Sequence, residues 1–197
     1  MTTAERNNFS DANDVDRIME IAQANDNPHE LIHLVQDNAD AIFTWNYDKG
    51  ERAKLDKLYE KSKTSQWNAT TDLDWSIEVD PYEALNLQLE LQMDPSNVED
   101  PDSPLYSWGD KEWREFGLQS AKWRLSQFMH GEQGALLCTA KIVETVPWID
   151  AKYYAAQQTV DEARHVEAFA RYLNDNLDGG YPVNPHLRLL VDDIFKD

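Results

Sequence analysis

The amino-acid sequence predicts an all-α protein, and three observations support this fold class. Apolar residues recur at intervals of three and four over long stretches, above all after Lys111, and this is the period of an amphipathic helix. No stretch shows the alternation of apolar and polar residues that is typical of a half-buried strand. Proline and glycine stand where the periodic stretches end, at Pro147 and at the Gly179–Gly180 pair.

Short elements are expected in the first half of the chain. Residues 1–27 are rich in Asn, Asp and Ala, and we expect a mobile N-terminal arm ahead of one helical domain over residues 28–197. Pro28 suits the first turn of a helix, where its missing N–H does no harm. We expect three short helices, at residues 28–43, 49–68 and 82–92, and apolar spacing supports the first of them. An acidic, proline-rich loop is then expected up to Gly109.

Two long helices and a short one are expected in the second half. Their predicted ranges are residues 111–146, 151–177 and 186–195. Pro147 ends the first helix, and Asp150 is suited to cap the second. Pro185 suits the first turn of the last helix, with Asn184 as its cap. Because the connection is short, we expect the two long helices to pack antiparallel.

Composition and charge narrow the classes of function. The formal net charge is −19, from 37 acidic and 18 basic residues, so the surface repels nucleic acid and anionic membranes. The single cysteine, Cys138, excludes an intramolecular disulfide and a cysteine-rich metal cluster. Neither a signal-peptide pattern nor an apolar run of about 20 residues is present. We therefore expect a cytoplasmic protein without a membrane or nucleic-acid partner.

Glu132 stands at the centre of a helical stripe that is apolar apart from this carboxylate and Thr139. Stepping by three and four along this helix gives Leu125, Phe128, Glu132, Leu136, Thr139 and Val143. A buried carboxylate is costly unless it is paired or bound to a metal. An ion pair with an arginine such as Arg164 is the alternative that the pattern leaves open. Gly131 and Gly134 flank Glu132 and would let another helix approach closely.

The next helix carries a second candidate cluster. Glu162 and His165 are three residues apart, so both side chains leave one face of the helix. A carboxylate with an imidazole suits iron or manganese, and zinc as well. The E-x-x-H spacing is common by chance, but an inward carboxylate on the preceding helix makes the combination far more specific.

These residues carry a resemblance to a known family. The string D-E-A-R-H, residues 161–165, resembles the motif of bacterial multicomponent monooxygenases and of the ribonucleotide reductase small subunit. The strings HGEQGALLCTAKIVETVPWIDAKYYAA, DEARHVEAFARYL and YEKSKTSQWNATTDLDW resemble a less characterised bacterial branch of ferritin-like di-iron oxygenases, loosely akin to p-aminobenzoate N-oxygenases. The resemblance covers about residues 55–195 and implies a ferritin-like helical bundle.

The resemblance also implies roles for individual residues. Glu132, Glu162 and His165 correspond to metal ligands of a di-iron or iron–manganese centre that uses dioxygen as co-substrate. A small organic molecule would be the second substrate. Asp161 would accept the N–H of a ligating histidine from the opposing half-site, and Arg164 would pair with an acidic neighbour.

The chain departs from the family because it holds only half of the site. It contains three of the expected metal ligands, whereas a di-metal site needs about six. We therefore expect a half-bundle with additional N-terminal helices. A second copy in a homodimer could supply the missing ligands, or a complementary chain could supply them. In the third alternative, truncation has removed them and the site is incomplete.

Three functions follow from these alternatives. The first is a dioxygen-activating oxidoreductase, and the second is iron storage with a ferroxidase-type site that uses the same ligands. The third is a helical interaction module without catalysis.

Other polar residues are expected to have structural roles: Glu60 should form a solvated ion pair with nearby lysines, and His130 should contribute to packing. The tryptophans, including Trp67 and Trp75, are expected in the core.

Overall fold

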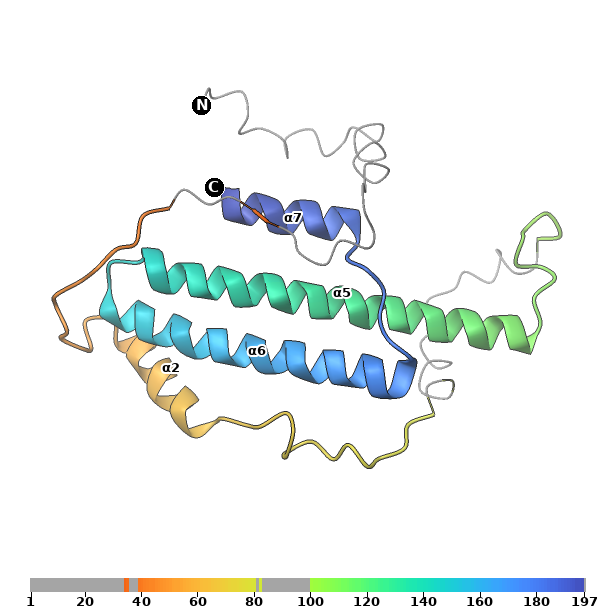
Figure 1. Ribbon diagram of the computed structural model, residues 1–197, viewed down its shortest axis with the longest axis horizontal. Helices are drawn as coiled ribbons and strands as arrows, with labels where there is room; N and C mark the ends of the chain where they lie inside the picture. The colour runs from red at the N-terminus through yellow and green to blue at the C-terminus, as the bar shows by residue number, and fades with distance from the viewer. Residues whose placement is uncertain (1–33, 36–38, 81, 83–99, 197) are drawn as a thin grey trace, which may run out of the picture. The chain divides into compact units, whose positions relative to one another are not determined.

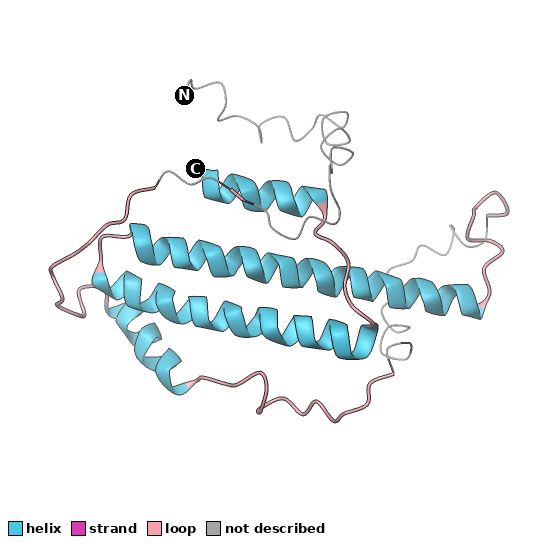
Figure 2. Ribbon diagram, viewed as in Figure 1, coloured by secondary structure: helices cyan, strands magenta, loops and turns pink. Residues whose placement is uncertain are grey.

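The computed structural model describes residues 34–35, 39–80, 82 and 100–196, and its regular elements are all helices (Figures 1 and 2). They are α2 (Ala53–Thr64), α5 (Asp110–Thr145), α6 (Ile149–Leu177) and α7 (Pro185–Lys196). No strand occurs in these ranges, which confirms the all-α prediction for them. The predicted arm at residues 1–27 lies outside the described residues, as does the predicted helix at 82–92 apart from the helical Tyr82.

Two separate units contain these helices. Residues 39–181 form one unit with α2, α5 and α6, and α7 belongs to the other. The last helix begins as predicted, because the side chain of Asn184 accepts the backbone N–H of His186 at 2.9 Å. No helix among the described residues has the length and apolar character needed to cross a membrane.

α5 and α6 lie side by side and run in opposite directions, as predicted (Figure 1). α5 ends where Val146 takes an extended conformation, because the residue before a proline avoids the helical region. α6 ends at Asp178, which is left-handed with φ 55°, followed by Gly179 with φ 85°. Small buried side chains let the two helices approach closely, and Thr159 donates to the hydroxyl of Thr139 across the pair at 3.1 Å.

The position of Asp150 contradicts a sequence prediction. It does not cap α6 but lies inside the first turn, and Trp148 is the cap residue. Its carboxylate is 2% exposed and accepts the backbone N–H groups of Gly50 at 3.2 Å and Arg52 at 3.1 Å. These charge-assisted bonds fix the chain just ahead of α2 against the start of α6.

The described N-terminal residues contain less helix than predicted, and the rest of the first predicted helix, residues 28–33 and 36–38, lies outside the described residues. Residues 39–42 are not helical, because the N–H of Ile42 instead donates to the carbonyl of Glu144 near the end of α5 at 2.9 Å. The predicted helix at 49–68 is limited to α2. The side chain of Asn68 accepts the N–H groups of Thr70 and Thr71, and such local bonds compete with helix formation.

Residues 65–80, here called the flanking segment, run beside α6 without regular structure (Figure 1). Three side chains on successive turns of α6 hold this segment. Arg164 donates to Gln66, Glu167 accepts from Thr70 at 3.1 Å, and Arg171 lies over the ring of Trp75 at 4.3 Å. The spacing of the three residues places them on one face of the helix. The flanking segment therefore forms a wall next to α6.

Candidate metal centre

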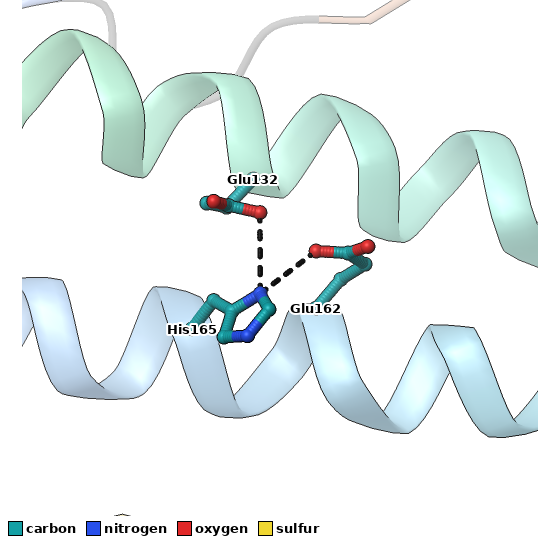
Figure 3. Close-up of side chains that lie close together, drawn as sticks. All are labelled: Glu132, Glu162 and His165. Carbon is teal, nitrogen blue, oxygen red and sulfur yellow. Dashed lines mark hydrogen bonds and ion pairs between the residues drawn. The ribbon is translucent and has the colours of Figure 1, made fainter. Parts of the chain in front are cut away.

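The three predicted ligands meet between α5 and α6. Glu132 comes from the middle of α5, and Glu162 and His165 come from neighbouring turns of α6 (Figure 3). Nδ1 of His165 lies 3.0 Å from Oε2 of Glu162 and 3.4 Å from Oε2 of Glu132. The other ring nitrogen faces away from both carboxylates (Figure 3). The short turn between the helices thus brings together side chains that are about thirty residues apart in the sequence.

The arrangement fits a divalent metal ion. One ligand atom from each residue can be chosen so that all three lie within 4.8 Å of one another. Small divalent ions hold oxygen and nitrogen ligands at about 2.0–2.2 Å, so opposite ligands stand about 4.2 Å apart. Within the described residues, no other group of three or more His, Cys, Asp or Glu side chains comes as close together. Only modest side-chain movement is needed for these residues to surround an ion.

The electrostatics of the site favour a bound cation. Burial, followed by the nearby Glu162 carboxylate, raises the pKa of Glu132 above its ordinary value, and His165 opposes this shift. Two carboxylates near one another repel unless a proton or a metal ion lies between them. The side chains are half-buried, with exposed fractions of 28% for Glu132, 18% for Glu162 and 41% for His165. The site therefore stays open to solvent on one side.

Asp161 and Arg164 flank the site on α6. Arg164 forms an ion pair with Asp161, which confirms that it pairs with an acidic neighbour. Its guanidinium also lies 5.4 Å over the ring of Trp67, and that ring is 6.2 Å from the ring of His165. The alternative pairing of Arg164 with Glu132 is wrong. The role of Asp161 toward an opposing histidine stays a prediction.

Two residues that we did not assign to the site have other partners. Glu60 pairs with Lys49 at 2.7 Å and Lys63 at 2.6 Å, as predicted, and its hydrogen bond with Lys49 is the main cause of a lowered pKa. His130 is half-buried, and its Nε2 donates to the carbonyl of Tyr181 at 2.9 Å. Both arrangements have a structural explanation that involves no metal.

The sequence interpretation missed the position of the flanking segment. Trp67 and Trp75 were expected in the core, but both are only half-buried and lie under arginines of α6. The signal was present in the spacing: the tryptophans are eight residues apart, and their partners Arg164 and Arg171 are seven apart. A segment of turns and irregular structure beside a helix does not share the period of the helix, so this match was not evident.

Replacing Glu132 with glutamine should stabilise the metal-free protein at neutral pH. The folded state raises the pKa of Glu132, so it favours the protonated form of this carboxyl group. The stability that Glu132 contributes is therefore fully present below its unfolded-state pKa and is lost as the pH rises through its folded-state pKa. Glu132→Gln removes this penalty and should raise the unfolding midpoint by about 2–4 °C for each kcal/mol of repulsion removed. Thermal unfolding with a chelator present measures the effect, which should vanish near about pH 4.

Glu144→Gln is the matched control for this substitution. Glu144 lies exposed near the end of the same helix and pairs with Lys141 at 2.7 Å, so its replacement should not raise the midpoint. A lower midpoint for Glu132→Gln at neutral pH would show that the two carboxylates do not repel each other in the folded chain.

Comparisons with known proteins leave the family unassigned. No family model, no curated protein and no solved structure matches this chain. Support for a metal centre comes from the geometry of Glu132, Glu162 and His165.

Proposed function

We infer that this chain binds iron, or iron and manganese, and serves as one half of a dioxygen-activating oxidoreductase with a ferritin-like bundle. One observation carries the proposal. A glutamate on one long helix and an E-x-x-H pair on its antiparallel neighbour converge, with ligand atoms within 4.8 Å. This is the half-site arrangement of di-metal carboxylate proteins, in which two such helix pairs face each other.

A second helix pair would complete the site. The face beside Glu132 is open: Phe128, one turn away, is 61% exposed, and a Cβ atom at Gly131 would meet nothing within 4 Å. A second copy of the chain, related by a two-fold axis, would bring the same three ligands to the opposite side. The alternative source is a complementary chain with its own Glu and E-x-x-H.

Charge makes this association depend on metal. Each copy carries a net charge of −19, and a pair of copies would place four carboxylates around one centre. Divalent cations between these carboxylates offset the repulsion, so the assembled form should bind metal better than the separate chains do.

The side chains of this site have distinct tasks. Glu132 and Glu162 offer carboxylate oxygens, and His165 offers Nδ1 once that atom carries no proton. The ring of Trp67, 6.2 Å from that of His165, limits the orientations of the imidazole. When bound, the metal pair would supply the electron transfer that dioxygen reduction needs.

Iron storage is the second candidate, because the 41% exposure of His165 leaves a path for iron to enter.

Anaerobic loading with Fe(II), followed by addition of dioxygen, distinguishes the oxidoreductase from the storage protein. An oxidoreductase should take up about two irons per pair of chains and consume dioxygen repeatedly when a reductant is present. A storage protein should form a large assembly with many irons per chain. A folded protein that takes up no iron would exclude both functions and favour an interaction module.

A further inference from the structure

A cavity of about 590 Å³ opens beside His165, within the unit that holds the candidate metal centre. Side chains from three parts of this unit line it. They include Leu125 from α5, Phe169 and Tyr172 from α6, and Leu73, Trp75 and Ile77 from the flanking segment. The volume lies in the range of about 300–1,000 Å³ that is typical of small-molecule sites.

Hydrogen bonds and ion pairs hold the wall of this cavity in place. The indole N–H of Trp75 donates to the carbonyl of Ala69 at 2.6 Å, and Arg171 covers a face of the same ring. Arg171 is itself held by Asp175 at 3.2 Å. The tryptophan wall is therefore ordered before any ligand arrives, which reduces the entropic cost of binding.

The lining selects for an uncharged and largely apolar molecule. Leu73, Ile77 and Leu125 offer only hydrocarbon, and the aromatic rings of Phe169 and Tyr172 offer flat surfaces for stacking. Acidic groups lie in and beside the lining: Asp74 is a lining residue, and two carboxylates lie next to the lining residue His165. Their field opposes an anionic ligand.

His165 connects the cavity to the candidate metal centre. Its Nδ1 lies near Glu132 and Glu162, and the same side chain lines the cavity. We propose that the cavity is the substrate site of this protein and takes an uncharged, apolar organic molecule against the wall formed by the flanking segment. The assignment as a substrate site rests on the proposed function, whereas ligand binding itself does not require a metal.

Calorimetric titration in the absence of metal tests whether the cavity binds a ligand. The full chain is titrated with indole and, for comparison, with indole-3-carboxylate. The wild type should bind indole, and the anion should bind about tenfold more weakly or worse. Ala168→Trp would fill the cavity from α6, and Ile77→Asp would place a charge in its wall. Both should lose indole binding by about tenfold or more.

Ala156→Trp is the matched control, because Ala156 is exposed on the same helix and does not line the cavity. It should bind indole like the wild type. Ile77 is 60% exposed in a segment without regular structure, so Ile77→Asp should fold. This variant therefore tests the cavity even if Ala168→Trp fails to fold. Equal indole affinity in the wild type and in Ile77→Asp would overturn the proposal, as would tighter binding of the anion.

Paramagnetic relaxation by Mn(II) then tests the connection to the metal centre. With Mn(II) bound, the ring protons of indole should relax faster in the wild type than in Ile77→Asp. Indole that binds without any such enhancement in the Mn(II)-loaded protein would overturn the substrate assignment. If Mn(II) and Fe(II) do not bind at all, the proposed function fails, while the calorimetry alone still decides whether the cavity takes apolar molecules.

Discussion

His165→Ala should lose most of its bound iron while α5 and α6 stay folded. His165 is the only imidazole among the three candidate ligands, and its Nδ1 lies between the two carboxylates at 3.0 and 3.4 Å. Loss of a residue that only supports a ligand already costs about 10–100-fold in metal affinity, so loss of the ligand itself should cost more. Metal analysis after anaerobic loading, together with circular dichroism, measures both parts of the prediction.

Glu60→Ala is the control for this experiment. Glu60 is a carboxylate on α2 that pairs with two lysines in an exposed position, and its replacement should leave the iron content unchanged. If Glu60→Ala strips iron and His165→Ala does not, the ligand assignment is wrong.

Divalent metal should convert the protein from a monomer to a dimer. The described part of each chain offers three candidate ligands, and about six are needed for a di-metal site. A metal concentration of about 100 times its dissociation constant favours the binding-competent form by about 2.7 kcal/mol per site, or roughly a hundredfold in the association constant. Sedimentation with Fe(II) under anaerobic conditions should show twice the mass of the chain, and a chelator should reverse it.

Gly131→Trp distinguishes a dimer formed through the metal face from any other association. A side chain at Gly131 has open space in the single chain, so the variant should fold, yet it would block a helix that approaches beside Glu132. Ala140→Trp, at an exposed position of the same helix, is the matched control and should dimerise like the wild type. A folded wild-type monomer whose mass does not respond to iron would exclude the homodimer.

Much of the helical architecture was predictable because its signals are local. Pro147 marks the end of α5, and the glycines after Asp178 mark the end of α6, within one or two residues. Asp150 was misinterpreted because its partners, Gly50 and Arg52, are about a hundred residues away in the sequence. A capping pattern describes only neighbouring residues, and here a long-range contact determines the role of the carboxylate.

The candidate site could be predicted for a similar reason. The three-residue spacing of Glu162 and His165 determines their common face, and the short turn brings Glu132 opposite them. The cavity could not be predicted, because nearly half of its lining residues come from a segment with no helical period. Its position depends on tertiary contacts made by Arg164, Glu167 and Arg171.

These three contacts also limit how the sequence can change during evolution. Arg164, Glu167 and Arg171 each hold one residue of the flanking segment, so a change on one side alone leaves a polar group or an aromatic face without its partner. Homologues should therefore change these positions in pairs, with residue 164 following 66 and residue 171 following 75. The sequence of the helix that carries Glu162 and His165 should therefore co-vary with that of a segment more than eighty residues earlier in the chain.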